Sequence, residues 1–148
     1  MDRLWQAPTA AMRLRVPSRT ILVDDALQGQ IAQDVAVEVG DFVLKRGDGV
    51  YAYQLACVVD DLAMGIGEVV RGADLLGSTP RQVLLAELLG GTPPTFAHVP
   101  LVVAADGSRL AKREPAVTVR DHREAGRPPD TIVSTLARLL GLPSHGSP

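Results

Sequence analysis

The sequence predicts an α/β protein in which a parallel sheet with helices follows a β-rich segment. Two patterns lead to this prediction. From Val69 onward, stretches typical of strand, helix, strand and helix alternate, as they do around a parallel sheet. Before residue 52, β-branched and partly alternating stretches indicate strands separated by turns. Sheets of the parallel type bind ligands beyond the carboxyl ends of their strands, so the residues that follow each strand are the first candidates for a site.

Length and composition are those of one soluble domain. The chain has 148 residues, of which 46% are hydrophobic, and this is enough to bury a core. Its formal net charge is −2 and its isoelectric point is about 5.9, so the field of the whole molecule does not attract phosphate backbones. A nucleic-acid contact would have to rest on a local basic patch.

Cysteine and histidine usage excludes two kinds of site. Cys57 is the single cysteine, which excludes a disulfide framework. His98, His122 and His145 lie far apart in the sequence, and together with one cysteine they form no cluster for a zinc site. The sequence contains no signal-peptide core and no apolar stretch of about 20 residues. We therefore expect a cytoplasmic protein without a membrane partner.

The first third is expected to be mainly β. A short strand is expected over Met12–Val16, and β-branched, partly alternating strands over Thr20–Asp25 and Gln33–Arg46. The Gly-Asp-Gly chemistry between Arg46 and Tyr51 predicts a turn. Apolar residues then recur at helical spacing, which predicts a helix from Ala52 to about Gly65.

The later elements follow the alternating pattern. A buried strand is expected over Gly67–Gly72, followed by a helix with Ser78 or Thr79 as its cap, Pro80 in its first turn and its end at residues 90–91. A central strand is expected over His98–Gly107. We expect a mobile connection over residues 113–128 and an amphipathic helix over residues 129–141, beginning near Asp130.

Two residues near element ends have the chemistry of ligand contacts. Arg71 emerges at a strand end beside Gly72, where its guanidinium fork suits a carboxylate or phosphate, or forms a surface pair with Asp74. Tyr53 opens a helix at the edge of the sheet. Edge packing is the commoner role of such a tyrosine, with a single hydrogen bond from its hydroxyl as the alternative.

Two further candidates flank the central strand. His98 is a ligand contact or a satisfied strand-edge histidine. The loop "DGSRLAKRE" (Asp106–Glu114) places Gly107, Arg109 and Lys112 after a buried strand. An ammonium group on such a loop neutralises charge that develops on a phosphate, although a solvated basic loop is the commoner case. We take phosphate binding by Lys112 as the working hypothesis.

Two blocks of the sequence carry a family resemblance. They are "DFVLKRGDGVYAYQLACVVDDLAMGIGEVVRGADLLGSTPRQ" (Asp41–Gln82) and "HVPLVVAADGSRLAKRE" (His98–Glu114). They resemble the class I glutamyl-tRNA synthetase family, and most closely its short glutamyl-Q tRNA(Asp) members, from about Met12 to Leu142. The resemblance implies the C-terminal half of a class I aminoacyl-tRNA synthetase Rossmann-like catalytic domain, preceded by part of a β-rich insertion.

The resemblance also implies a reaction and its partners. Glutamate would be activated by ATP, normally with Mg²⁺, to glutamyl-adenylate, and transferred to queuosine of tRNA(Asp). Tyr53 and Arg71 match family residues that bind glutamate. The stretch "RLAKR" (Arg109–Arg113) matches the KMSKS-type loop, so Lys112 and Arg109 would serve the phosphates of ATP. The stretch "PLVV", with Pro100 and Leu101, would run beside the adenine.

The sequence departs from the family pattern in several places. Ala111 replaces the usual small hydroxyl residue of the loop, and Arg109 replaces its first lysine. The H-x-G-H signature, the N-terminal part of the glutamate pocket and the cysteine-rich zinc segment of the family do not occur. We therefore expect a truncated or split form, inactive or impaired and only partly folded alone, with a complementing N-terminal half as a possible partner.

The expected organisation has three parts. Residues 1–48 are a partial β-rich insertion, residues 49–142 are the C-terminal half of the catalytic domain, and residues 143–148 are a disordered tail. Two other interpretations stay open. The chain is a fragment of an ordinary glutamyl-tRNA synthetase, or it is a non-catalytic remnant that binds something.

Overall fold

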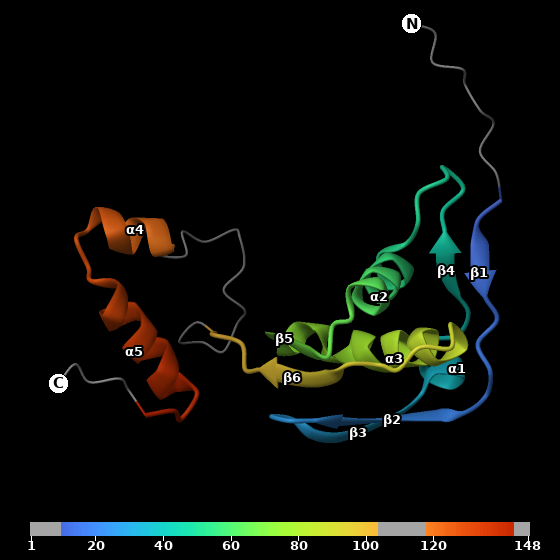
Figure 1. Cartoon of the computed structure of the whole chain (residues 1–148), viewed down its shortest axis with the longest axis horizontal. Helices are drawn as coiled ribbons and strands as arrows, with labels where there is room; N and C mark the ends of the chain where they lie inside the picture. Colours follow the sequence, from blue (N-terminus) through green and yellow to red (C-terminus); the bar gives the residue numbers. More distant parts are fainter. Residues whose placement is uncertain (1–9, 104–117, 144–148) are drawn as a thin grey trace, which may run out of the picture. The chain divides into compact units, whose positions relative to one another are not determined.

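The computed structural model describes residues 10–103 and 118–143 (Figure 1). The chain forms two compact units, Met1–His98 and Val99–Pro148. The first unit holds two sheets and the helices that pack on them, and the second holds two helices. In the described ranges no helix is both long and apolar enough to cross a membrane.

The main sheet of the first unit has four strands in the order β3-β2-β6-β5. Strand β2 pairs antiparallel with β3 and parallel with β6, so the sheet is mixed and not wholly parallel as predicted. The antiparallel pair arises because the side chain of Asp25 accepts hydrogen bonds from the N–H groups of Leu27 and Gln28, which closes a turn directly after β2. The four strands are β2 (Thr20–Asp25), β3 (Gly29–Asp34), β5 (Glu68–Gly72) and β6 (Thr95–Val99).

A second, two-stranded sheet pairs β1 (Met12–Leu14) antiparallel with β4 (Phe42–Lys45). The sequence predicts one strand over residues 33–46, and this is wrong. Helix α1 (Val35–Glu38) interrupts it, because the Asp34 carboxylate accepts from the N–H groups of Ala36 and Val37 and so caps a helical turn. Gly40, at a φ of 72°, then lets the chain turn back into β4.

Helix α2 (Tyr53–Met64) confirms the predicted helix, including its end at Gly65, which takes the left-handed conformation with a φ of 67°. The 3-10 helix η1 (Ala73–Ser78) leads into α3 (Thr79–Leu88), and Pro80 lies in the first turn of α3 as predicted. The predicted side-chain cap is wrong. Ser78 makes no capping bond, and the hydroxyl of Thr79 accepts from Arg71 instead.

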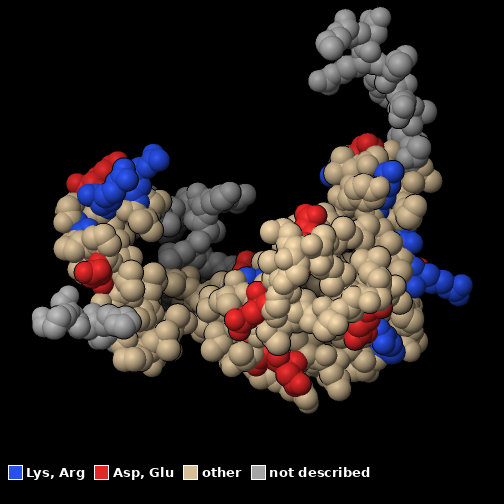
Figure 2. Space-filling view, viewed as in Figure 1, with Lys and Arg blue, Asp and Glu red and all other residues tan. Residues whose placement is uncertain are grey.

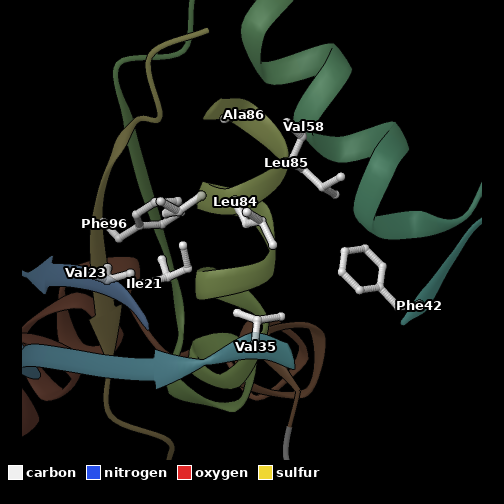
Figure 3. Packing of buried hydrophobic residues seen from close by; sticks show 10 residues of the cluster. Ile21, Val23, Val35, Phe42, Val58, Leu84, Leu85, Ala86 and Phe96 are labelled. Carbon is white, nitrogen blue, oxygen red and sulfur yellow. The ribbon is translucent and has the colours of Figure 1, made fainter. Parts of the chain in front are cut away.

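The core of the first unit lies around α3, between the main sheet and α2 (Figure 3). Leu84 on α3 is fully buried with Ile21 and Phe96 of the sheet, and Leu85 faces Val58 of α2. Because α3 contacts both α2 and the sheet, five consecutive residues, 82–86, are buried, which an amphipathic surface helix does not allow. This packing holds the strand ends in place.

Two strand predictions need correction. The stretch 67–72 is a strand, but it is not buried, because β5 lies at one end of the strand order and Val70 is 63% exposed. The central strand is confirmed as central, but it starts at Thr95 and ends at Val99, not at Gly107. Residues 104–107 of that prediction lie outside the described residues.

The second unit contains α4 (Val119–Glu124) and α5 (Pro129–Leu139). Helix α5 confirms the predicted C-terminal helix. Helix α4 lies within the predicted connection 113–128, and it forms because Thr118 and Asp121 make a reciprocal capping box. The sequence analysis missed this pattern because it weighed only the charges, prolines and glycines around it.

The packing around α3 predicts a large loss of stability when Leu84 is shortened. We expect Leu84→Ala to lower the free energy of unfolding by about 2–5 kcal/mol, since it opens a cavity in the core. Leu88→Ala on the same helix is the matched control, because Leu88 is 51% exposed, and we expect a loss below about 1 kcal/mol there. Urea unfolding followed by circular dichroism measures both, and equal losses would contradict the described core. A cooperative transition of the wild-type chain would also contradict the expectation of partial folding.

Candidate functional site

Three strand ends meet at one edge of the main sheet. Strand β2 ends at Asp25, β6 carries His98 one residue before its end, and β5 carries Arg71 one residue before its end. Because β6 lies between β2 and β5 in the strand order, the three polar side chains become neighbours. This is the kind of position at which α/β sheets bind ligands.

The guanidinium of Arg71 is held by several partners. Its Nε donates to Nε2 of His98 at 2.9 Å, and its Nη2 donates to Oγ1 of Thr79 at 2.8 Å. The carbonyl oxygen of Leu75 makes a longer contact with Nη2, at 3.5 Å. The guanidinium carbon also lies 5.4 Å from the centre of the Phe96 ring, in a cation–π contact. Arg71 is therefore a positioned side chain and not a freely moving surface arginine.

His98 is fully buried and contacts Asp25 in two ways. Its Nδ1 lies 2.5 Å from Oδ2 of Asp25, and its backbone N–H donates to Oδ1 at 3.1 Å. Its ring stacks on Phe96 with the ring centres 6.0 Å apart, and its carbonyl accepts from the side chain of Gln28 at 2.8 Å. Of the two roles left open for His98, the structure shows the hydrogen-bonded histidine, near the end of the strand and not at its start.

Asp25 connects the turn after β2 to β6. Its Oδ1 accepts from three backbone N–H groups, those of Leu27 at 3.0 Å, Gln28 at 2.9 Å and His98 at 3.1 Å. Burial by itself would raise the pKa of this carboxyl, but the hydrogen bonds from the His98 ring and from these N–H groups lower the pKa of Asp25 well below its usual range. Asp25 is therefore an ionised, buried carboxylate.

Tyr53 stands at the start of α2 and is 56% exposed. A hydrogen bond with Cys57, one turn further along, and then burial raise the pKa of Tyr53, while the positive charge of Arg71 opposes this rise. Burial lowers the pKa of Arg71, against the attraction of Tyr53 and Cys57, and a guanidinium stays protonated under such a shift. Tyr53 and Arg71 thus affect each other electrostatically, and the binding of one glutamate by both stays a prediction.

Pro100 and Leu101 belong to the second unit. They line an apolar cavity of about 470 Å³ together with their strand and loop neighbours Val99, Val102 and Val103, with Leu136 and Leu139 of α5, and with Leu140 directly after α5. A cavity of this size can hold a small molecule. Pro100 and Leu101 thus line one side of this hollow, and α5 with its C-terminal end lines the other, while the adenine-binding role stays a prediction.

Arg109 and Lys112, which the sequence analysis assigns to phosphates, lie outside the described residues. Within residues 10–103 and 118–143, no three His, Cys, Asp or Glu side chains are grouped closely enough to hold a metal ion. The described site therefore consists of Arg71, Tyr53 and the groups that hold them.

The sequence analysis missed Asp25 and Thr79. The signal for Asp25 was incomplete, because the strand period places Asp25 on one face with Ile21 and Val23, but the run of apolar residues 21–23 does not tell which face is buried. A buried aspartate at a strand end requires donors, and one of them is a candidate site residue. Thr79 gave no such signal, because its hydroxyl has the sequence pattern of an ordinary helix cap.

Charges are dispersed over the first unit. On the face shown in Figure 2, lysine and arginine side chains of residues 10–98 are separated from one another and mixed with acidic side chains. A further group of basic side chains in this view lies over α4 and is likewise mixed with acidic ones, since this helix carries Asp121 in its first turn and His122 and Arg123 in its last.

The lowered pKa of Asp25 predicts a pH dependence of stability. A carboxyl whose pKa is lower in the folded than in the unfolded chain stabilises the fold above its ordinary value of 3.8, and this contribution is lost as the pH falls below it. We expect Asp25→Asn to lower the free energy of unfolding at neutral pH by about 1–3 kcal/mol. The difference in the free energy of unfolding between wild type and Asp25→Asn should shrink as the pH falls below 3.8.

Denaturant unfolding at a series of pH values measures this gap. Asp24→Asn is the control, because Asp24 is exposed on the same strand and accepts a surface hydrogen bond from Gln30. A gap between wild type and Asp25→Asn that stays constant into strong acid would contradict the ionised, hydrogen-bonded state of Asp25.

Comparisons with known proteins agree with the resemblance seen in the sequence. A protein named glutamyl-Q tRNA(Asp) synthetase from Nitratidesulfovibrio vulgaris is 52% identical over 132 residues, which are 89% of this chain and 41% of that protein. A protein of the same name from Nocardia farcinica is 50% identical over 142 residues, 96% of this chain and 44% of that protein. The chain thus spans less than half the length of these relatives.

Solved structures and a family model give the same result. A structure described as a glutamate tRNA ligase from Elizabethkingia meningosepticum in complex with its amino acid matches with a TM-score of 0.64 and 32% identity. The match covers 80% of this chain and 22% of the other. The family model for the catalytic domain of tRNA synthetases class I (E and Q) matches residues 3–147. The chain therefore belongs to the class I tRNA synthetase (E and Q) catalytic-domain family.

Proposed function

We propose that this chain supplies part of the active site of a glutamyl-Q tRNA(Asp) synthetase-type ligase. The observation that carries the proposal is the identity of 50–52% over 89–96% of the chain to relatives with that name. In the proposed reaction, a carboxylate oxygen of glutamate forms a bond to the α-phosphorus of ATP. The bond from that phosphorus to pyrophosphate breaks. A nucleophilic oxygen of the queuosine base of tRNA(Asp) then bonds to the glutamyl carbonyl carbon and loses its proton, while the bond from that carbon to AMP breaks and AMP leaves.

We assign glutamate binding to Arg71 and Tyr53. Arg71 is permanently cationic, and two of its nitrogens are held by Thr79 and His98, so it can meet a carboxylate with little loss of side-chain freedom. Its Nη1 has no acceptor among the described residues. The half-exposed side chain of Tyr53, which Arg71 affects electrostatically, supplies a second polar contact.

We assign ATP to the second unit and to the loop 106–114. The apolar cavity beside Pro100 and Leu101 offers space and stacking surface for an adenine ring, with backbone groups as specific contacts. Lys112 and Arg109 are assigned to the phosphates, because flexible cations can follow charge as it moves to the leaving pyrophosphate. Mg²⁺ would be bound with ATP itself. No zinc site is assigned.

The remaining assignments concern partners and organisation. We propose tRNA(Asp) as the acceptor, with the basic residues of α4 as a candidate contact, and cytoplasm as the place of action. We also propose that residues 1–48 correspond to part of a β-rich insertion and residues 49–142 to the C-terminal half of the catalytic domain. We also propose a complementing N-terminal half as a protein partner.

Substitution of Arg71 tests the glutamate assignment. We expect Arg71→Lys to weaken glutamate binding roughly 10- to 100-fold, because an ammonium cannot keep the bonds to His98 and Thr79 while it contacts a carboxylate. The glutamate-dependent rise in the melting temperature of the chain measures binding. Arg46→Lys is the control, since Arg46 is an exposed residue paired with Asp48. Equal glutamate affinity in both variants would contradict the assignment.

Substitution of Lys112 tests the phosphate assignment. We expect Lys112→Ala to slow glutamate-dependent exchange of pyrophosphate into ATP by about 10²–10³-fold and to leave glutamate affinity unchanged. The exchange is measured with the chain alone and with the N-terminal part of the Nocardia farcinica relative added.

The same assay separates the ligase from a non-catalytic binding protein. The absence of any glutamate-dependent exchange, with and without the added part, would contradict the ligase proposal. Exchange that requires the added part would support a split enzyme.

A further inference from the structure

The groups behind Arg71 form a buried chain from the turn after β2 to the guanidinium. We propose that Asp25 and His98 are positioning residues, in which Asp25 keeps His98 in the Nδ1–H form so that its Nε2 orients Arg71 toward the substrate. This inference rests on the proposed role of Arg71 in binding glutamate. It assigns a function to two residues that contact neither glutamate nor ATP in the proposed reaction.

The hydrogen-bond geometry determines the tautomer of His98. Arg71 has donors and no acceptor, so the 2.9 Å contact from its Nε requires an unprotonated Nε2 with a lone pair. The proton of the neutral ring therefore sits on Nδ1 and is donated to Oδ2 of Asp25 at 2.5 Å. Doubly protonated His98 would place a donor against the donor of Arg71. A carboxylate on one ring nitrogen commonly fixes the tautomer that the other nitrogen needs.

The chain of contacts determines which part of the guanidinium is left for a ligand. In a guanidinium group, Nε–H and one N–H of Nη2 point in the same direction and form one edge of the group. In Arg71, His98 and Thr79 accept hydrogen bonds along this edge. The Thr79 hydroxyl accepts from Arg71, so its own hydrogen remains for Nε2 of His98, 3.2 Å away, or for the carbonyl of Leu75, 3.5 Å away. Nη1 is the remaining nitrogen, and it has no acceptor among the described residues. The substrate carboxylate is therefore expected at Nη1.

Burial makes this arrangement stiff. His98 is 0% exposed and Asp25 is 5% exposed, so water cannot replace a lost partner inside the chain of contacts. The ring also packs against Phe96, whose face lies under the guanidinium. A change at Asp25 is thus transmitted to Arg71 through the imidazole.

Asp25→Asn tests the tautomer by changing one group. Because Oδ1 accepts from three backbone N–H groups, the oxygen of the new amide must stay there, and its NH₂ must face Nδ1 of His98. An NH₂ group donates, so Nδ1 must lose its proton and Nε2 must gain it. Nitrogen NMR of labelled histidine near neutral pH should report Nδ1–H in wild type and Nε2–H in Asp25→Asn. Nε2–H or a doubly protonated ring in wild type would overturn the proposal.

A matched pair of substitutions at His98 separates positioning from simple structural support. The amide of His98→Asn reaches the Nδ1 position and can satisfy Asp25, but it offers nothing to Arg71. The amide of His98→Gln reaches the Nε2 position and can accept from Arg71, but it leaves Asp25 without its ring partner. Both variants remove the ring and leave an uncharged amide, and urea unfolding identifies the folded fraction of each.

The variant that binds glutamate more tightly should therefore be the less stable of the two. We expect His98→Gln to keep the Arg71 Nε–H signal protected from exchange and to bind glutamate roughly 10-fold more tightly than His98→Asn. We expect His98→Asn to be the more stable of the two. Equal protection of Nε–H and equal glutamate affinity in both variants would overturn the positioning role.

The outcomes distinguish this inference from the proposed function. If wild type shows no glutamate-dependent shift in melting temperature, the glutamate assignment fails. The histidine tautomer and the protection of the Arg71 Nε–H still decide whether Asp25 and His98 orient the guanidinium. If wild type binds glutamate and Asp25→Asn leaves both the tautomer and the affinity unchanged, the glutamate assignment stands and the positioning pair is wrong.

Discussion

The buried carboxylate of Asp25 is the group on which the rest of the site depends. One of its oxygens closes the turn after β2 and holds the backbone of β6, and the other binds the ring of His98. A buried carboxylate without partners would be very costly, so each of these contacts offsets part of the cost of burying Asp25. These contacts connect the antiparallel pair β2–β3, the parallel pair β2–β6 and the guanidinium of Arg71 into one hydrogen-bonded network.

The hydrophobic core supports this hydrogen-bonded network. Helix α3 begins with Thr79, which binds Arg71, and continues into Leu84 and Leu85, which fill the space between the sheet and α2. The residue that helps to hold the guanidinium therefore lies on the most buried helix of the described chain. Tyr53 lies at the first turn of the helix on the other side of this core. Such a support is what a binding site needs in order to present charge in a fixed direction.

Local patterns predicted most helices, because glycine ends, prolines and apolar spacing act within a few residues. Gly65 and Pro80 are examples. They did not predict α1 and α4, where Asp34 and Thr118 start short helices by side-chain bonds. They also did not predict that Asp25 and His98 meet, since 73 residues separate them and only the parallel pairing of β2 and β6 brings them together. Arg71 and Tyr53 were predicted as single candidates, but the contact of Arg71 with His98 depends on the sheet order, in which β6 lies beside β5.

The central claim is that Arg71, held by His98 and Thr79, binds the carboxylate of glutamate. Titration of the labelled chain with glutamate, followed through the arginine side-chain signals by NMR, tests it most directly. We predict that the signals of Arg71 shift with glutamate and not with valine at the same concentration, while those of the exposed Arg46 stay in place. Arg71 signals that do not move while glutamate binds elsewhere on the chain would contradict the claim.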